Sequence, residues 1–509
     1  NHLIDAGWSV LVLEAQPEVG GAVRSDREVH PDFVHDTFSA FYPLAATSPH
    51  IEAFHLEQHG LRWQHAPAVL GHPRPDGSWA LLHRDRHVTA DLMERAAAGD
   101  GEAWLDTCAE WDRIGDQIVG ALLSPFPPVR HGVAAAARLR SVGGLGFVRT
   151  LLSPATELGR GRFRGDAPRL LIAGNAGHAD IPLDGAGSGL MGLLLCMLGQ
   201  TVGFPVPAGG AGELAQALAR RARSLGGEIQ CSSRVTRVVV QAGRATGVET
   251  ADGERIQARK AIVADVIAPH LYGGLVPAEE LPSRVMKSME KFRMDASTVK
   301  VDWALSGPVP WESPPPNAPG TVHIADSVNQ MSEALSQVAA DAIPAAPFLL
   351  TGQMTTSDPS RSPAGTESLW AYTHVPQHTD RDAGDGSIRG VWDRDDCERF
   401  ADRMQARIER HAPGFGSRVL ARRVLGPREM EQLDANLLGG GLNGGTSQLD
   451  QQLVFRPIPG LGRSETPVKG LYLGSASAHP GGGVHGAPGM NAARAAIAHA
   501  RIPRLRRWE

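Results

Sequence analysis

The first apolar run of the chain is short and unbroken, and it predicts a buried parallel strand. Residues 8–13 (WSVLVL) are almost all apolar and rich in β-branched side chains, the pattern of a strand covered on both faces. The residues before them (NHLIDAG) resemble the last turns of a helix that stops at Gly7. The strand ends in Glu14. A buried strand that ends in an acid is typical of the second strand of a dinucleotide-binding βαβ unit, where the carboxylate accepts hydrogen bonds from a ribose hydroxyl.

The glycine fingerprint of such a unit lies about 20 residues before the acid. Counting back from Glu14 places it before residue 1, so we expect the given chain to begin inside the first helix, after the phosphate-binding loop. Gly20, Gly21 and Arg24 follow the strand. Paired glycines let the backbone approach a ligand closely, and an arginine beside them suits a pyrophosphate. Taken alone, this segment would be interpreted as a glycine turn with a solvated arginine.

Residues 209–265 form a second block with the order expected of a flavin-type dinucleotide domain. Two glycines lead into residues 213–225, an amphipathic helix that two more glycines stop. Val235 lies where the backbone would meet an adenine ring. Strands are predicted over 228–231, 234–241, 246–250 and, as another buried strand, 260–264.

The most specific pattern lies near the end of the chain. Residues 470–475 (GLYLGS) predict a buried strand, and a glycine-rich loop over 478–490 leads into a helix over 491–500. A strand, a glycine-rich loop and a helix N-terminus turn free backbone N–H groups and the positive end of the helix dipole toward a ligand. Reduced flavin develops negative charge at the N1/C2 side of its ring, which such a helix end would stabilise.

Composition and charge exclude several classes of protein. The 509 residues correspond to about three folding units. With 50 basic and 55 acidic residues, the chain lacks the basic field of a nucleic-acid-binding protein. Four widely spaced cysteines predict buried free thiols, no metal site and a reducing compartment. There is no signal-like start, and the apolar segment 190–198 is too short to span a bilayer. We therefore expect a cytoplasmic protein in which this segment is a buried or re-entrant surface helix.

Together these segments resemble the phytoene-desaturase-like branch of the FAD-dependent amine oxidase superfamily, and within it bacterial relatives of pyridine nucleotide-disulphide oxidoreductase domain-containing protein 2. The resemblance rests on EAQPEVGGAVRS, the helix-and-strand block and LYLGSASAHPGGGVHGAPGMNAARAA. Residues 36–50, 99–104 and 174–195 also match, so that it covers nearly the whole chain. It implies an α/β fold in which a Rossmann-like FAD-binding domain (GxGxxG-type) is interleaved with an α+β substrate domain. The FAD-binding domain would comprise residues 1–60, 205–270 and 440–509, and the substrate domain residues 61–204 and 271–439.

The resemblance also implies which residues contact FAD. Glu14 would bind the adenosine ribose, and Val235 would meet the adenine. The pyrophosphate region would fall to Gly20, Gly21 and Arg24. The ribityl chain and the isoalloxazine would be lined by Gly474, Ser475, Gly486, Gly489, Met490 and Asn491.

The implied reaction is dehydrogenation of a small, largely apolar organic substrate by hydride transfer to flavin N5, or a redox-neutral isomerisation on the flavin. No catalytic residue is assigned. His479 and His485 are candidates for a general base, although hydrogen bonds to the backbone or to flavin are the favoured interpretation. His178 and Asp180 could face the pocket, although a loop-capping pair is the favoured interpretation. A flavin amine oxidase is an alternative, but its aromatic cage would be thinly supplied by four tyrosines. A non-catalytic flavin-binding scaffold is the alternative from a different class.

Residues 130–169 carry eight arginines against two acids, interleaved with apolar side chains. Such a basic amphipathic segment can lie on an anionic membrane surface. The favoured alternative is a solvated face with internal ion pairs to the acidic stretch 380–402. The eight arginines are Arg130, Arg138, Arg140, Arg149, Arg160, Arg162, Arg164 and Arg169. Peripheral membrane contact therefore stays open, and the electron acceptor and oligomeric state are not predicted.

Overall fold

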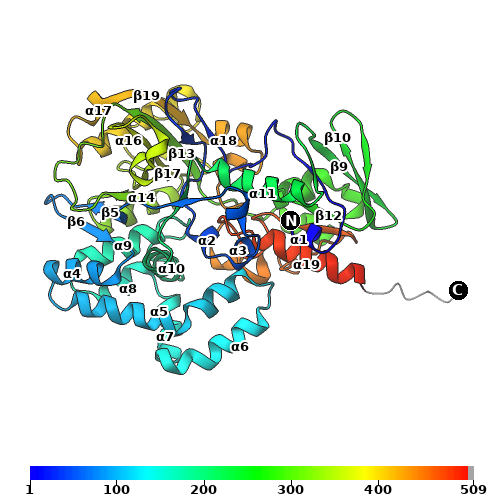
Figure 1. Cartoon of the computed structure of the whole chain (residues 1–509), viewed down its shortest axis with the longest axis horizontal. Helices are drawn as coiled ribbons and strands as arrows, with labels where there is room; N and C mark the ends of the chain where they lie inside the picture. Colours follow the sequence, from blue (N-terminus) through cyan, green and yellow to red (C-terminus); the bar gives the residue numbers. More distant parts are fainter. Residues whose placement is uncertain (502–509) are drawn as a thin grey trace.

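A computed structural model describes residues 1–501, which form two bodies lying side by side (Figure 1). The larger body surrounds a seven-stranded sheet, and the smaller one holds the first strand and the last helix. Each is assembled from segments far apart in the sequence: the large sheet joins strands from residues 68–82 to strands from 297–425. The predicted α/β class is confirmed. The five segment boundaries stay a prediction.

The seven strands follow the order β19–β13–β17–β16–β14–β5–β6. All neighbours pair antiparallel except β14 and β5, which run parallel where the two halves of the body meet. The bounds are β19 (Val419–Leu425), β13 (Ser297–Leu305), β17 (Glu367–Val375), β16 (Leu349–Gln353), β14 (Pro319–Ile324), β5 (Ala68–Pro73) and β6 (Trp79–Leu82).

Hydrophobic cores lie on both faces of this sheet. β13 is buried along its whole length, with Val299, Val301 and Trp303 in one core and Lys300 and Asp302 paired on its other face. On one face, Leu70 and Leu82 pack with Trp104 from the long helix α5 (Asp100–Leu123). On the other, Trp303 packs with Phe400 from α16 (Arg394–Glu409). The first face also carries α4 (Arg86–Ala96), α8 (Ala155–Arg162), α9 (Asp166–Ala176), α10 (Ser188–Thr201) and α14 (Val328–Ala339).

The apolar segment 190–198 lies inside α10, which is almost wholly buried in the first core. A buried helix was one of the two interpretations the sequence allowed, and it is the one the structure shows. No helix within residues 1–501 combines the length and the apolarity that crossing a bilayer requires. Cys108, Cys196 and Cys397 are buried free thiols as predicted, whereas Cys231 is only half-buried.

The smaller body contains two parallel ladders and a three-stranded antiparallel sheet. In the ladders, β1 (Leu11–Leu13) pairs with β8 (Glu228–Gln230), and β12 (Ile262–Ala264) pairs with β20 (Leu471–Leu473). The predicted strands of the second block are therefore all present, and the helix before them is α11 (Gly212–Ser224). The sheet contains β9 (Val235–Gln241), β10 (Arg244–Thr250) and β11 (Arg255–Gln257).

Two of the predicted buried strands are more exposed than expected. Leu11 and Val12 in β1 keep 39% and 45% of their surface accessible, and β12 is half-buried throughout. The cause is the open edge of each ladder: within residues 1–501, β1 pairs only with β8 and β12 only with β20. The strand β20, in contrast, is buried as predicted.

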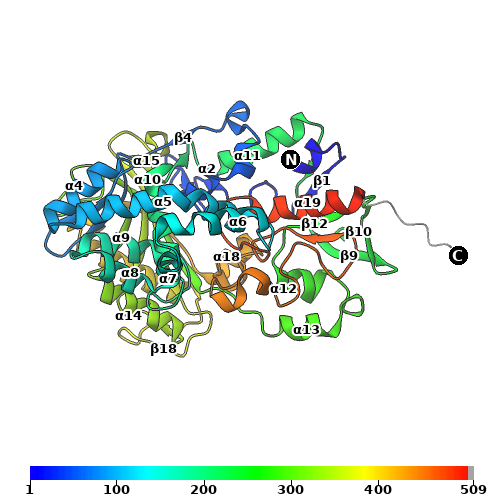
Figure 2. The same cartoon turned by 90° about the horizontal axis from the view of Figure 1, so that it is seen from below.

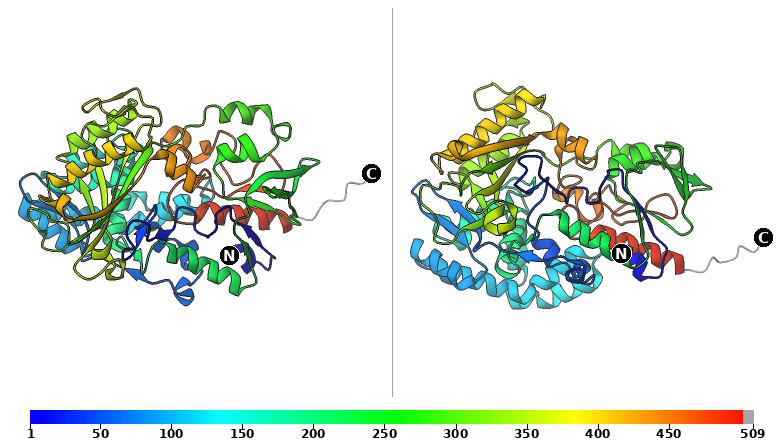
Figure 3. Two further views of the ribbon diagram at one scale, coloured as in Figure 1. Left: turned by 90° about the horizontal axis from the view of Figure 1, so that it is seen from above. Right: turned by 45° about the horizontal axis from the view of Figure 1, so that its top comes forward.

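The first and last elements lie together across the smaller body. The short helix α1 (His2–Asp5) contacts α19 (Ala487–Arg501), and the Asn1 side chain donates to the Leu218 carbonyl of α11. Figure 3 shows the N-terminus lying between α11 and α19. Residues from the beginning, the middle and the end of the chain therefore meet in one place.

Shorter elements connect the two bodies and cover their edges. Helices α2 and α3 lie between the two bodies in Figure 1, and β4 pairs with β7. Their bounds are α2 (Pro43–Ala46), α3 (Pro49–Glu52), α12 (Ala268–His270), α13 (Ser283–Met289), α15 (Met354–Ser357), α17 (Phe415–Arg418), α18 (Pro427–Leu433), β2 (Ser25–Asp26), β3 (His35–Asp36), β4 (Trp63–Gln64), β7 (Val206–Pro207), β15 (Ala342–Ile343) and β18 (Arg381–Asp382).

The basic segment 130–169 folds into α6 (Val129–Arg138), α7 (Leu145–Leu152), α8 and the start of α9. Helices α6 and α7 lie along the lower edge of the larger body (Figures 1 and 2). The favoured expectation of ion pairs with residues 380–402 is wrong. Acids of that stretch pair with His378 and with arginines near them, such as Arg389 and Arg403, rather than with residues 130–169. The reason is distance, because α16 packs on the second face of the sheet, at the top of the larger body in Figure 1, whereas α6 and α7 lie at its bottom.

Candidate functional site

The predicted cofactor residues lie where the carboxyl ends of β1, β12 and β20 meet. Glu14 follows β1 directly, and Gly474 follows β20 and donates its N–H to the Ala264 carbonyl at the end of β12 (2.9 Å). In open α/β sheets, ligands bind outside the carboxyl ends of the parallel strands. The topology thus brings together segments that are more than 200 residues apart in the sequence.

The Glu14 end of the site is closed by two backbone hydrogen bonds from the loop before β9. Ser233 N–H donates to the Glu14 carbonyl at 2.8 Å, and Ser232 N–H donates to the Gln16 carbonyl at 2.9 Å. The Glu14 side chain accepts from Gln16 N–H at 2.8 Å and keeps its other carboxylate oxygen for further donors. Val235 begins β9 two residues later. The two residues predicted to hold adenosine therefore share one corner, while their contacts with it stay a prediction.

The Gly20–Gly21 turn favours glycine at both positions. Gly20 adopts φ +133°, and a Cβ there would lie 2.6 Å from the Val23 carbonyl oxygen. Gly21 adopts φ +54°, and its Cβ would lie 3.3 Å from Asp434 Oδ2. Both conformations are ones that L side chains rarely adopt. A cradle of bare backbone is what a closely approaching pyrophosphate needs, so the turn fits the predicted role.

Arg24 fixes this turn against the end of α18. Its guanidinium donates to the Leu433 carbonyl at 3.4 Å and lies 5.5 Å from the centre of the Phe38 ring. The Gln16 amide donates to the same carbonyl at 3.2 Å. Because neither contact uses a carboxylate, the Arg24 charge remains available to an anionic ligand.

Two carboxyl groups that the sequence reasoning missed converge on the same place, Asp265 after β12 and Asp434 after α18. Burial, helped by Asp434 and Glu14, raises the pKa of Asp265 from 3.8 to about 6. The Asp265 residue is nevertheless accessible to solvent. A group that is both accessible and surrounded by protein faces a recess. Burial also raises the pKa of Asp434, against the hydrogen bond from Asn436 and the charge of Arg24. The sequence does carry a local signal for Asp265, because it is an acid directly after a strand, like Glu14. It carries no such signal for Asp434.

The raised pKa of Asp265 gives the apo protein a pH-dependent stability. The folded state binds this proton more tightly than the unfolded state does, so the stabilisation is lost as pH rises from about 4 through about 6. We expect Asp265→Asn to raise the melting temperature of the apo protein at pH 7.5 and to leave it unchanged at pH 4. Thermal unfolding at both pH values measures this. Asp91→Asn, at an exposed acid on α4, is the matched control and should change neither. Equal gains at both pH values would contradict the assignment.

At the other end of the site, Gly474 and Gly489 bring β20 and the first turn of α19 into close contact. A Cβ at Gly474 would lie 3.0 Å from Val263 Cγ1 and 3.5 Å from the Gly489 Cα. Gly486 adopts φ +68° just before α19 and accepts from Met490 N–H at 3.0 Å. The N-terminal N–H groups and the positive dipole end of α19 are therefore held near the end of β20.

Three further predicted residues, Ser475, Met490 and Asn491, are buried at this junction. Ser475 accepts from Ala478 N–H at 2.9 Å through its carbonyl. The Asn491 Oδ1 atom has no hydrogen-bond partner within residues 1–501. A buried acceptor without a partner is costly, and a ligand that offers an N–H or O–H group would satisfy it. Together with the glycine turn, this atom shows that the residues present fit a flavin nucleotide.

His479 and His485 are both held by backbone groups. His485 Nδ1 accepts from Ala487 N–H at the start of α19 (3.1 Å), and burial lowers the pKa of His485 to about 4. His479 Nε2 faces the Ser124 carbonyl at 3.1 Å, and burial lowers the pKa of His479 as well. Both rings are therefore neutral near pH 7, and their geometry matches the favoured interpretation, a hydrogen bond to the backbone.

This geometry predicts a small effect of replacing His485. Asparagine can accept the same hydrogen bond from Ala487, so we expect His485→Asn to keep turnover within about threefold of the wild type, whereas losing a general base costs about 10²–10⁴-fold. Initial rates from pH 5 to 9 measure this, and His378→Asn, at an exposed histidine, is the control. A drop of a hundredfold or more would make His485 a catalytic residue.

Across from the glycine-rich loops, β17 presents aromatic side chains to a second part of the recess. Phe41 lies 6.0 Å from the Trp370 ring, which stacks on Tyr372 at 5.9 Å. The Tyr372 hydroxyl lies 3.3 Å from His178 Nδ1, and His178 Nε2 lies 3.0 Å from His323 Nε2. Burial raises the pKa of Tyr372 and lowers that of His178 to about 3, so both are neutral.

Tyr372 and His178 each keep some accessible surface, yet burial is the main cause of the shift in each pKa. Both side chains therefore line a space that protein encloses. Leu44 joins this lining to the cofactor side, because a Cβ at Gly483 would lie 3.0 Å from Leu44 Cδ1. Asp180 instead accepts from Ser447 N–H at 2.7 Å. Asp180 therefore caps a loop, as favoured, whereas His178 contacts Tyr372 and His323 instead.

The charged groups around this recess are satisfied by other protein groups. Arg456 is fully buried and donates to four backbone carbonyls, among them Ala476 at 3.0 Å. Asp295 accepts from three backbone N–H groups of the glycine-rich loop 439–445. Arg361 pairs with Asp36 and Asp358. Lys300, whose Nζ lies 6.0 Å from the centre of the Trp370 ring, is likewise paired with the buried Asp302. The charges nearest Trp370 are therefore paired within the protein.

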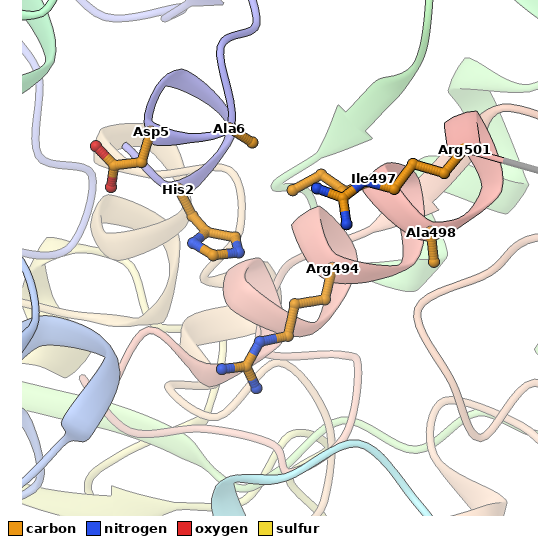
Figure 4. A pocket seen from close by; sticks show the side chains of 7 residues that line it. All are labelled: His2, Asp5, Ala6, Arg494, Ile497, Ala498 and Arg501. Carbon is orange, nitrogen blue, oxygen red and sulfur yellow. The ribbon is translucent and has the colours of Figure 1, made fainter.

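A separate recess of about 380 Å³ lies between α1 and α19 (Figure 4). His2 and Asp5 from α1 and Arg494 and Arg501 from α19 line it. None of the predicted FAD-contacting residues is among its lining residues. The recess therefore does not coincide with the site described above.

Comparison with known proteins agrees with this geometry. Residues 1–329 match the family of flavin containing amine oxidoreductases. The chain is 30% identical over 538 residues to mouse (Mus musculus) pyridine nucleotide-disulfide oxidoreductase domain-containing protein 2, covering 97% of this chain and 90% of that protein. It is 27% identical to a lycopene-forming phytoene desaturase of Pseudescherichia vulneris, over 59% of this chain and 56% of that one.

Among solved structures, the fold resembles that of an oxidoreductase from Methanosarcina mazei, with a TM-score of 0.57 and 14% identity over 97% of this chain and 96% of that one. At this identity the likeness shows the fold alone. The predicted family, fold class and cofactor are confirmed. The chain belongs to the flavin-containing amine oxidoreductase family, and it is a phytoene-desaturase-like, FAD-dependent oxidoreductase.

Proposed function

We propose that this oxidoreductase dehydrogenates a largely apolar organic molecule that binds in the recess between β17 and the glycine-rich loops. The observation that carries the proposal is the lining of that recess: Phe41 and Leu44 with the neutral Tyr372 and His178, backed by the buried ring of Trp370. An apolar, aromatic lining favours a substrate held by burial and shape rather than by charge. The resemblance to a phytoene desaturase supports the same class of substrate.

The same lining argues against an amine as the substrate. A protonated amine needs a carboxylate or an aromatic cage. Of the four tyrosines, Tyr42 and Tyr272 are buried in cores and Tyr472 bonds to His499. Only Tyr372 reaches the recess, and it stacks on Trp370 at 25° instead of facing a second ring across a gap.

FAD supplies the two-electron acceptor of the reaction when it is bound. The residues of the chain would hold it: Glu14 and Val235 at the adenosine end, Gly20, Gly21 and Arg24 at the pyrophosphate, and the Gly474–Ser475 and Gly486–Asn491 segments at the ring. The positive end of α19 would stabilise negative charge on the reduced cofactor. The apolar walls would exclude water and orient the C–H bond to be broken.

Anaerobic reduction of the bound flavin tests the proposal. We expect phytoene delivered in detergent micelles, or a shorter unsaturated hydrocarbon, to bleach the flavin absorbance, and a primary amine such as benzylamine to leave it unchanged. Bleaching by the amine alone would contradict the proposal and favour an amine oxidase. Formation of a rearranged product without bleaching would favour an isomerase. If no substrate of either class bleaches or is converted, the chain is better described as a flavin-binding scaffold.

A further inference from the structure

Helices α6 and α7 carry an apolar surface patch that no other element in residues 1–501 covers. Val129 and Val133 in α6 are 67% and 66% exposed, and Leu145 in α7 is 83% exposed. Val129 and Val133 are four residues apart and share one helix face. We call Val129, Val133, Leu145 and Leu152 the α6–α7 patch. Exposed large apolar side chains on two successive helices mark an interaction surface.

The patch continues onto a neighbouring loop. Gly187 N–H donates to the Leu152 carbonyl at 3.0 Å, and a Cβ at Gly187 would lie 3.5 Å from Leu449 Cδ1. Leu449 is 46% exposed, and three further exposed apolar side chains follow it at 453–455. Figure 2, which views the molecule from below, shows α6 and α7 on the near side.

The basic side chains of the two helices make no ion pairs. Arg130, Arg138, Arg140 and Arg149 are exposed, and within the described chain none has a carboxylate oxygen within 4.0 Å. Further along the same segment, Arg162 pairs with Glu110 and so belongs to the fold. Four unpaired cations beside an apolar patch complement a surface that is both anionic and apolar.

The patch also lies next to the flavin-side loop. The residues between α5 and α6 contact that loop directly: Ser124 accepts from His479 at 3.1 Å, and the Phe126 ring lies 6.0 Å from the His479 ring. Phe126 also accepts from Arg463 at 3.1 Å. Helix α6 begins three residues after Phe126. Any surface that binds the α6–α7 patch would therefore lie close to one wall of the site.

We infer that the α6–α7 patch docks on the surface of an anionic lipid bilayer, with its apolar side chains at the acyl boundary and its arginines among the headgroups. The docked protein would lie on the membrane without crossing it. This inference rests on the proposed function in one respect only: a bilayer is the phase in which a largely apolar substrate would be dissolved.

Vesicle co-sedimentation of the FAD-loaded protein tests the inference without turnover. We expect binding to phosphatidylcholine vesicles that contain phosphatidylglycerol, little binding to phosphatidylcholine alone, and release at about 0.5 M NaCl, where charges are screened within a few Å. Each arginine near an anionic surface is worth about fivefold in partitioning, so Arg130→Ala with Arg149→Ala should lower the partition coefficient about 25-fold. Leu145→Asp should lower it about tenfold or more.

A matched control separates this patch from any other exposed surface. Arg259→Ala with Leu420→Asp changes an exposed arginine and a leucine that is 54% exposed on β19, at the opposite edge of the molecule in Figure 1, and should bind like the wild type. Flavin content and circular dichroism check that each variant is folded.

Absence of low-salt binding by the wild type would overturn the inference, as would equal loss of binding in the control variant. A dimer in solution that Leu145→Asp dissociates would assign the patch to a second copy of the chain instead. Substrate-dependent bleaching that persists without vesicle binding would leave the proposed function standing.

Discussion

Replacing Arg361 with methionine is expected to lower the free energy of unfolding by about 3–5 kcal/mol. The Arg361 guanidinium is fully buried. It donates to both carboxylate oxygens of Asp36 at 3.0 Å and to Asp358 at 2.9 Å. Removing the cation would leave two buried carboxylates without their counter-charge, which costs far more than the pair itself gains over an apolar replacement. Urea unfolding followed by circular dichroism measures the change.

The effect should reach the cofactor side, because the two carboxylates also hold the start of α11. Asp36 accepts from Ala211 N–H at 2.7 Å, and Asp358 accepts from Gly209 N–H at 2.8 Å. Adding Asp36→Asn to Arg361→Met should recover part of the loss, since it removes one of the uncompensated charges. Arg399→Met is the control: Arg399 pairs with Asp395 at 3.0 Å but is 49% exposed, so its loss should cost about 0.5 kcal/mol or less. A cost below about 1 kcal/mol for Arg361→Met would contradict the assignment.

Replacing Gly20 with valine is expected to weaken FAD binding about a hundredfold or more. At φ +133° a β-branched side chain is strained, and its Cβ would lie 2.6 Å from the Val23 carbonyl oxygen. Strain of this kind costs about 1–3 kcal/mol before the clash is counted, and about 1.4 kcal/mol is a factor of ten in affinity. The turn would have to move, and with it Gly21 and Arg24. Fluorescence quenching of FAD added to the apo protein measures the affinity.

Gly253→Val tests whether the effect belongs to the cradle rather than to glycine strain in general. Gly253 has φ +87° in a turn of the three-stranded sheet, and a Cβ there would meet nothing within 4 Å. We expect this variant to lose some stability and to keep its affinity for FAD. If both variants lost affinity equally, the Gly20 turn would have no special place in the site.

The parts of the site that the sequence predicted are those with a local signature. Glu14 and Gly474 each end an apolar strand, and the glycines before α19 mark a loop that leads into a helix. Such patterns depend only on neighbours in the sequence, so they can be recognised without knowledge of the fold. The topology that brings β1, β12 and β20 together followed from the resemblance to a known family.

The remainder depends on contacts between distant residues. The pairing of Arg361 with Asp36 joins positions 325 residues apart, and nothing near either residue in the sequence indicates it. Asp434 reaches the Gly21 turn only because α18 packs beside it. The burial of β1 was misjudged for a related reason: strand composition indicates which faces suit a core, whereas exposure depends on which strands actually pair with it.

The central claim is that three distant segments of this chain hold one FAD. Its most direct test is the ratio of FAD to protein after reconstitution and gel filtration, measured from the absorbance of the flavin released on denaturation. The account predicts one FAD for each wild-type chain and a ratio near zero for Gly20→Val under the same conditions. A wild-type protein that retains no FAD after incubation with an excess of it would contradict the account.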